Sequence, residues 1–151
     1  MQVLLFTVES RRCAIPLSNV AEVVPAVNVE AVPDAPSMVE GVVNVRGEIL
    51  PVLSLRARLG FPRKSVDASE YFILVHTNAR RVIVRSDSPP EITTLTLPDE
   101  AAPGAESVER VLTGVIPLPD GLALLQDVEA IMSGMADVIF SPPDVVVEAS
   151  E

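Results

Sequence analysis

The chain contains an internal duplication, and this feature constrains its fold more than any other. An Arg-Arg pair in a polar turn between two β-prone runs occurs twice, and a glutamate in the next β-prone run recurs at the same offset. A glycine that opens a hairpin pattern recurs at a slightly longer offset, which places a short insertion in the second copy. The matched positions are Arg11-Arg12 with Arg80-Arg81, Glu22 with Glu91, and Gly41 with Gly114. A shared order of several elements predicts two copies of one small unit.

Each copy consists of short β-prone runs separated by turn signals. The clearest hairpin runs from residue 41 to residue 53, and Gly47 at its turn supplies the positive φ angle that other residues resist. With about five strands, each half suits a small β-barrel. A barrel of roughly 60 residues is only marginally stable by itself, so two barrels gain stability by packing together.

We therefore predict a mainly β fold of two small five-stranded β-barrels that share a core, with short helices that include one near the C-terminus. A single domain covers residues 1–136, with intertwined subdomains at roughly 1–62 and 70–136, and residues 137–151 form a C-terminal tail. The helix after the first hairpin has Ser54 as its N-cap and Gly60 as its stop. A second short helix is expected at residues 128–135.

The composition excludes several classes of protein. Hydrophobic residues make up 48% of the chain but aromatic residues only 3%, so the core must be built from Val, Leu and Ile. A formal net charge of −10 with a single lysine disfavours binding to nucleic-acid phosphates. No uncharged run exceeds nine residues, whereas a membrane span needs about twenty apolar residues. Because the N-terminus lacks the basic region of a signal peptide and Cys13 has no disulfide partner, we expect a cytoplasmic protein.

The negative charge is confined to the C-terminal third of the chain. Residues 1–98 contain ten acidic and ten basic side chains, whereas residues 99–151 contain eleven acidic side chains and one basic side chain, Arg110. An acidic loop is expected at residues 98–109. The second barrel is therefore expected to present a face that repels acidic partners and suits a basic one.

No arrangement of side chains in the sequence points to catalysis or to a metal. Cys13 and His76 are the only residues of their types, and a metal site would need three or four ligands. No serine has a plausible general base other than His76. Asp120 and Asp127 fall in a turn and at a helix cap, where carboxylates occur for local reasons. We expect no enzymatic activity, cofactor or metal; a small-ligand binder or enzyme on a double barrel is the alternative from another class.

Segments of the first half occur in an order and spacing that resemble the CheW family, the coupling adaptors of bacterial chemosensory arrays. The hairpin sequence Gly-Val-Val-Asn-Val-Arg-Gly at residues 41–47 is the most specific of them. The resemblance is strong over residues 2–62 and continues more weakly to about residue 133. It implies a fold of two SH3-like β-barrels. The segments that carry it are 6–16, 20–25, 33–36, 41–52 and 55–60.

The resemblance implies a non-catalytic adaptor that acts in the cytoplasm and is recruited to receptor clusters. Such an adaptor couples the cytoplasmic tip of a methyl-accepting chemoreceptor to the regulatory domain of a CheA-type histidine kinase, and it can contact other CheW-like proteins. Neither nucleic acid nor direct membrane insertion is implied. The mean hydropathy of +0.39 fits apolar surface that is buried in an assembly, or an aliphatic core that compensates for the missing aromatic residues.

The sequence departs from the family at several positions. The family usually has Asp where Ser54 stands, an apolar residue where Pro89 stands, and Leu where Gln126 stands. A divergent member that keeps only one partner surface and modulates the array is therefore an alternative. A module cut from a larger kinase or from a receiver-bearing adaptor is another. Since the first strand begins directly after Met1, a stand-alone adaptor is favoured.

The resemblance places Val20, Glu22 and Arg46 in the region of the receptor and kinase contacts. Arg46 at a hairpin tip can present paired donors to a carboxylate, and Glu22 can hold it in place; alternatively, the two are a solvated charge pair of little consequence. Two glycines have backbone roles, one in a close chain approach and one in the turn, and an asparagine can satisfy buried backbone groups across the hairpin. The predicted partner-binding set is Val20, Glu22, Gly41, Asn44, Arg46 and Gly47.

Overall fold

The computed structural model describes residues 2–77, 80–94 and 114–128. Strands dominate this part of the chain, and helix is limited to one short α-helix, one 3-10 turn and the helical residue Val128, so the mainly β prediction is confirmed. In chain order, the elements are β1 (Gln2–Val8), β2 (Arg11–Pro16), η1 (Leu17–Asn19), β3 (Val20–Pro25), β4 (Val39–Val45), β5 (Glu48–Leu53), α1 (Leu55–Leu59), β6 (Tyr71–His76), β7 (Arg81–Ser86), β8 (Glu91–Thr94), β9 (Val115–Leu118) and β10 (Gly121–Leu125).

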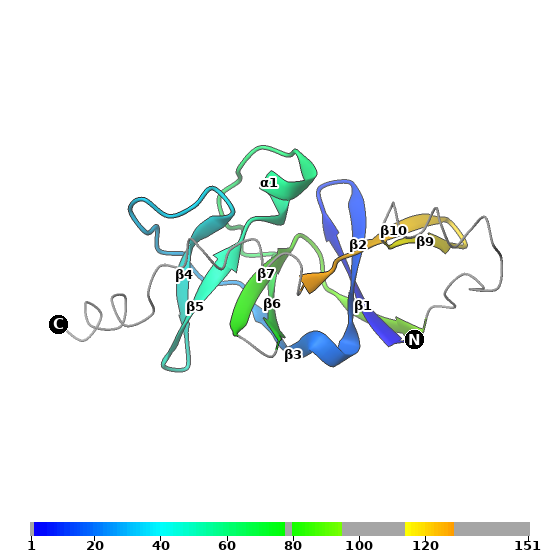
Figure 1. The fold of residues 1–151 in the computed structure, drawn as a ribbon, viewed down its shortest axis with the longest axis horizontal. Coiled ribbons are helices and arrows are strands. Elements are labelled where there is room, and N and C mark those ends of the chain that lie inside the picture. The colour runs from blue at the N-terminus through cyan, green and yellow to red at the C-terminus, as the bar shows by residue number, and fades with distance from the viewer. Residues whose placement is uncertain (1, 78–79, 95–113, 129–151) are drawn as a thin grey trace.

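The strands form two five-stranded sheets (Figure 1). Sheet A has the order β8-β1-β2-β10-β9, and sheet B has the order β3-β6-β7-β5-β4. Neighbouring strands are antiparallel except for the parallel pairs β2–β10 and β5–β7. Each sheet combines strands from both halves of the chain, because the β1–β2 and β6–β7 hairpins each join strands of the other half. The division at residues 62 and 70 stays a prediction, and the hydrogen-bonded sheets cut across it.

The duplication extends to the hydrogen-bonding register of the two sheets. In the parallel pair of sheet B, Val52 lies opposite Ile83, and in the parallel pair of sheet A, Leu125 lies opposite Ala14. The sequence separation between Val52 and Leu125 equals that between the matched glycines of the two copies. The separation between Ala14 and Ile83 equals that between the two Arg-Arg pairs. The copies therefore share one topology as well as one sequence pattern.

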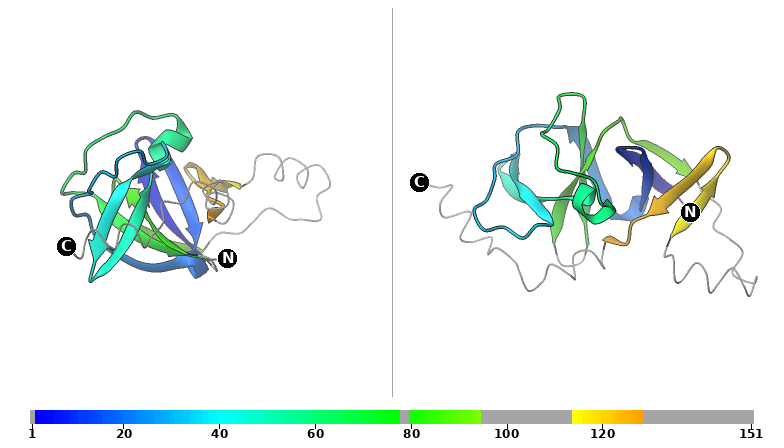
Figure 2. Two further views of the ribbon diagram at one scale, coloured as in Figure 1. Left: turned by 60° about the vertical axis from the view of Figure 1, so that its left-hand side comes forward. Right: turned by 90° about the horizontal axis from the view of Figure 1, so that it is seen from above.

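The β4–β5 hairpin and its counterpart in the second copy, the β9–β10 hairpin, lie far apart. The β4–β5 hairpin and the β9–β10 hairpin occupy opposite ends of the long axis of the molecule, with the β6–β7 and β1–β2 hairpins between them (Figure 1 and Figure 2). Surfaces on the outer hairpins therefore face different surroundings, and one partner can contact one end without covering the other.

A shared apolar core joins the two sheets. Its largest cluster takes Phe6 and Ile15 from sheet A and Leu53, Ile73 and Val82 from sheet B, and each of these side chains is at most 2% exposed. Smaller clusters lie around Phe72 in sheet B and around Ile116 in sheet A. The predicted common core, built mainly of aliphatic side chains, is thus observed, and burial of this apolar surface is the main source of stability.

The helix α1 begins and ends where the sequence predicts. The Ser54 hydroxyl accepts a hydrogen bond from the Ala57 N–H at 3.1 Å, and Gly60 has a φ angle of 85° that lets the chain leave the helix. The predicted acidic loop, C-terminal helix and tail lie outside the described residues, except for Val128. Within the described ranges, no helix has the length and apolar character needed to cross a membrane.

The first turn is shorter than the polar run at residues 9–12 predicts. Only Glu9 and Ser10 form the turn, and Arg11 already begins β2 opposite Val8. A two-residue connection is the length that hairpins prefer, and Glu9 has the positive φ angle of 55° that such a connection requires. Long polar side chains such as that of Arg11 can begin a strand because they remain exposed.

Candidate partner-binding surface

The tip of the β4–β5 hairpin is a two-residue turn that projects a charged side chain. Arg46 and Gly47 both have positive φ angles, of 50° and 90°, as in the turns whose twist matches that of a hairpin. The Asn44 side-chain oxygen accepts a hydrogen bond from the Gly47 N–H at 2.7 Å. Asn44 therefore satisfies a backbone group, as expected, but at the exposed turn rather than in a buried position. The result is a defined tip with Arg46 65% exposed.

Glu22 on β3 contacts this tip. Its carboxylate accepts a hydrogen bond from Nη2 of Arg46, which is the contact that the sequence predicts. The hydrogen bond and the charge of Glu22 raise the pKa of Arg46. No further contact of the Arg46 guanidinium is found among the described residues, so its other N–H groups can reach a carboxylate of a partner.

Apolar side chains lie on β3 and in the loop that follows it. Val20 begins β3 two residues before Glu22 and packs, half-buried, against the shared core. Val23 follows Glu22 and is 37% exposed, and Val27 in the next loop is 50% exposed. Because side chains alternate along a strand, Val23 lies on the face of β3 opposite Glu22, and Val20 is an apolar residue that shares the face of Glu22.

Gly41 lies away from the tip, near the beginning of β4, and is buried. A Cβ atom at this position would lie 2.2 Å from the Glu30 carbonyl oxygen and 2.8 Å from Cγ1 of Val29. The absence of a side chain lets Glu30 exchange two backbone hydrogen bonds of 2.9 Å with Val42. Gly41 therefore permits the close chain approach that the sequence predicts, and a direct contact with a partner stays a prediction.

We expect Gly41→Ala to lower the free energy of unfolding by about 1–3 kcal/mol, because the added methyl group must displace backbone atoms. Urea unfolding measures the loss. Gly47→Asn is the matched control, since the space around Gly47 is open and asparagine tolerates a left-handed conformation. An equal or larger loss in Gly47→Asn would contradict the close-approach explanation.

Two clusters of buried charges have no counterpart among the residues that the sequence singles out. Arg56 on α1 is 4% exposed and donates hydrogen bonds to Glu9 and to both carboxylate oxygens of Asp87, the latter at 3.0 and 2.8 Å. Arg85 on β7 is 5% exposed and forms two parallel hydrogen bonds with Glu70. Both guanidinium groups are interior and bound to partners within the protein, so they do not belong to the candidate surface.

The lone cysteine is buried in the folded chain. Cys13 lies on β2 with 0% exposure, and burial raises the pKa of its thiol to about 12. We expect a thiol reagent such as Ellman's reagent to leave the native protein unmodified and to react fully in urea, because the thiolate is the reactive form. The rate of reaction should follow global unfolding; rapid native-state modification would contradict this.

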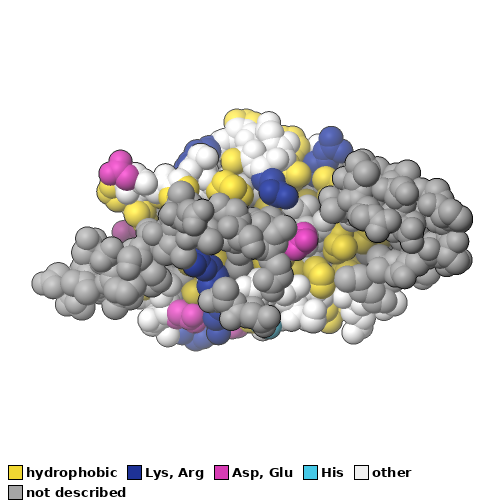
Figure 3. All heavy atoms as spheres, in the orientation of Figure 1, with side chains coloured by type: hydrophobic (Ala, Val, Ile, Leu, Met, Phe, Trp, Pro, Cys, Tyr) yellow, Lys and Arg dark blue, Asp and Glu magenta, His cyan; other side chains and the backbone are white. Residues whose placement is uncertain are grey.

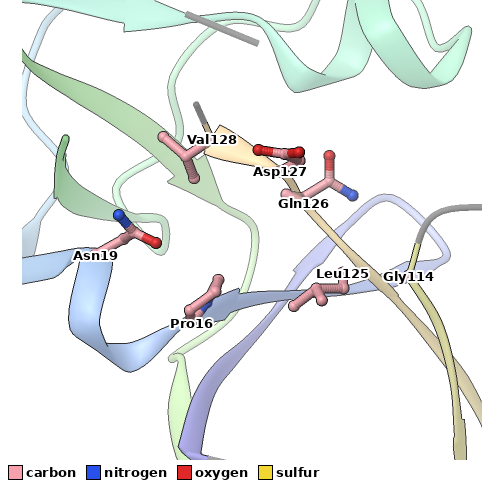
Figure 4. A pocket seen from close by; sticks show the side chains of 7 residues that line it. All are labelled: Pro16, Asn19, Gly114, Leu125, Gln126, Asp127 and Val128. Atoms are coloured by element: carbon pink, nitrogen blue, oxygen red, sulfur yellow. The ribbon is translucent and has the colours of Figure 1, made fainter. Parts of the chain in front are cut away.

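A small cavity of about 240 Å³ lies where β2, η1 and β10 meet (Figure 4). Asn19 lines it and donates a hydrogen bond to the His76 carbonyl oxygen at 3.0 Å. Among the described residues that line it are amide and carboxylate side chains, and no thiol, imidazole or hydroxyl group. Within the described residues, no three metal-ligating side chains cluster closely enough to hold an ion. The lining residues are Pro16, Asn19, Gly114, Leu125, Gln126, Asp127 and Val128.

Comparisons with known proteins place this geometry in context. A family profile described as the CheW-like domain matches residues 2–135. The chemotaxis protein CheW of Helicobacter pylori is 31% identical over 52% of this chain and 47% of its own length, so the chain spans about half of that relative. The chemotaxis protein CheW of Klebsiella aerogenes is 26% identical over 86% of this chain and 80% of its own length. The solved structure of scaffolding protein TtCheW from Thermoanaerobacter tengcongensis has the same fold, with a TM-score of 0.65 and 21% identity over 82% of each chain.

Proposed function

This chain belongs to the CheW-like domain family, and we propose that it is a non-catalytic adaptor of a bacterial chemosensory system. It couples the cytoplasmic tips of methyl-accepting chemoreceptors to the regulatory domain of a CheA-type histidine kinase, and it contacts other CheW-like proteins. It acts in the cytoplasm at receptor clusters, without cofactor or metal. The family membership and the names of its curated relatives support this role.

The observation that carries the proposal is the exposed Glu22–Arg46 pair at the β4–β5 tip. A guanidinium held from one side by a carboxylate is oriented before binding, so less side-chain entropy is lost when a partner carboxylate docks. Asn44 shapes the turn that presents the arginine.

A more specialised adaptor is the second candidate, and one observation favours it. The offset that relates Gly41 to Gly114 also relates Arg46 to Pro119, so the β9–β10 hairpin of the second copy has no arginine at this position. The glutamate is present in both copies, as Glu22 and as Glu91. Only one end of the described molecule therefore carries this charged pair. An adaptor that binds one partner strongly and modulates the array would use this asymmetry.

Calorimetric titration distinguishes the two candidates. The intact chain is titrated with the regulatory domain of its cognate kinase and, separately, with a receptor cytoplasmic-tip fragment. Binding to both partners supports coupling, and binding to one supports the specialised adaptor. Binding to neither partner would overturn the adaptor assignment.

A further inference from the structure

A second exposed ion pair lies beside the hairpin tip. Glu48 is the first residue of β5 and Arg81 is the first residue of β7. Because these neighbouring strands are parallel, their beginnings lie at the same end of sheet B. Nε of Arg81 is 3.6 Å from Oε2 of Glu48, and the side chains are 42% and 47% exposed. Acidic and basic side chains accordingly gather at the lower end of the molecule, next to the single histidine at the end of β6 (Figure 3).

The Glu48–Arg81 pair contributes little to the fold. Its separation exceeds hydrogen-bond distance, and exposed ion pairs of this kind add little or nothing measurable to stability. The buried Arg56 and Arg85 differ, because their donors are committed to partners inside the protein. Both Glu48 and Arg81 can therefore exchange their mutual contact for contacts with another molecule.

The two pairs together form an alternating pattern of charge. The first pair, Glu22 and Arg46, joins β3 to the hairpin tip. The second pair, Glu48 and Arg81, joins the beginning of β5 to the beginning of β7. Glu48 is separated from Arg46 only by Gly47, so a partner that docks on the tip also meets the second pair. Charges at the rim of an interface act mainly on selectivity and on the rate of association.

We propose that Glu48 and Arg81 determine which regulatory domain binds at this end of sheet B. The partner face that fits carries a carboxylate opposite Arg81 and a basic side chain opposite Glu48, beside the carboxylate that meets Arg46. A regulatory domain with the reverse arrangement is rejected by like-charge contacts. This inference rests on the proposed function and names the residues that give it specificity.

The internal duplication supplies a matched control. Arg12 is the counterpart of Arg81 in the first copy, and it forms an exposed pair with Asp120 at the turn of the β9–β10 hairpin, with hydrogen bonds of 2.9 and 2.7 Å. This pair lies at the opposite end of the molecule, where the sequence has no counterpart of Arg46. Exchanging its charges alters the same kind of contact away from the proposed surface.

The test exchanges the charges of each pair in the intact chain and measures affinity for the regulatory domain of the cognate CheA-type kinase. The double variant E48R/R81E keeps the net charge and an ion pair, so its melting temperature should match that of the natural chain. Its affinity should fall about tenfold or more at low salt, because two rim charges then face like charges. The loss should shrink at high ionic strength, which screens exposed charges. The double variant R12D/D120R should bind within about twofold of the natural chain.

The outcomes separate the inference from the proposed function. If the natural chain binds and E48R/R81E binds equally well, or R12D/D120R loses as much affinity, the specificity role is wrong while the adaptor role stands. If the natural chain itself does not bind the regulatory domain, the kinase-coupling role fails and the inference fails with it.

Discussion

Replacing Glu70 with alanine is expected to lower the free energy of unfolding by about 3–5 kcal/mol, because it leaves the buried guanidinium of Arg85 without its main counterion. The Glu70 side chain is 1% exposed, and its two oxygens accept hydrogen bonds from Nε and Nη2 of Arg85 at 2.8 and 2.9 Å. Arg85 also donates to Glu40 and to the carbonyl oxygens of Lys64 and Ser65. Arg85 thus ties β7 to β4 through Glu40 and to the connector before β6 through Glu70. Urea unfolding followed by circular dichroism measures the loss.

Two further variants make this expectation specific. Glu48→Ala removes a carboxylate from an exposed ion pair and should change the free energy of unfolding by less than about 1 kcal/mol. The triple variant E40Q/E70L/R85M removes all three charges of the cluster, since Glu40 also pairs with Arg85, and should recover much of the stability because no buried charge is then left unpaired. A loss of under about 1 kcal/mol in Glu70→Ala would show that Arg85 does not depend on this partner.

Replacing Arg46 with alanine should weaken binding to the kinase regulatory domain about tenfold or more, because well-placed arginines are frequent determinants of interface affinity. The melting temperature should hardly change, because Arg46 is exposed and contacts only Glu22 among the described residues. Titration calorimetry and thermal unfolding of the same preparations measure the two effects. Arg46→Lys should give an intermediate affinity, since lysine keeps the charge but not the planar arrangement of donors.

Arg58→Ala is the matched control for this experiment. Arg58 is an exposed arginine on α1, which lies away from the hairpin tip (Figure 1), and its loss should leave affinity unchanged. If Arg46→Ala instead lowered the melting temperature and left the affinity intact, the residue would be structural. The partner-binding role of the hairpin tip would then have to be abandoned.

Much of the local structure can be predicted from particular residues. Gly47 at the turn, Ser54 at the helix start and Gly60 at the helix end each act through their own backbone geometry or through a hydrogen bond to a near neighbour in the sequence. Such short-range effects are readable from neighbouring residue types. The contact between Glu22 and Arg46 can also be predicted, since the family resemblance indicates that the two positions lie in one region.

The buried ion pairs could not be predicted in the same way. Charged side chains are usually exposed, so nothing near Glu70 or Arg85 in the sequence distinguishes them from surface residues. They become partners only because β7 and the connector before β6 meet beside each other.

The amino-acid sequence by itself determined the duplication, the strand content, the hairpin tip and the uneven distribution of charge, because each of these follows from local residue order. Only the tertiary structure decided that the β1–β2 hairpin pairs with strands of the second copy in sheet A, and that the β6–β7 hairpin pairs with strands of the first copy in sheet B. It also brought Glu48 next to Arg81 through the parallel pairing of β5 with β7. Strand alternation indicates which face of a strand is buried but not which distant strand pairs with it. That choice depends on how the whole set of apolar faces is buried in one shared core.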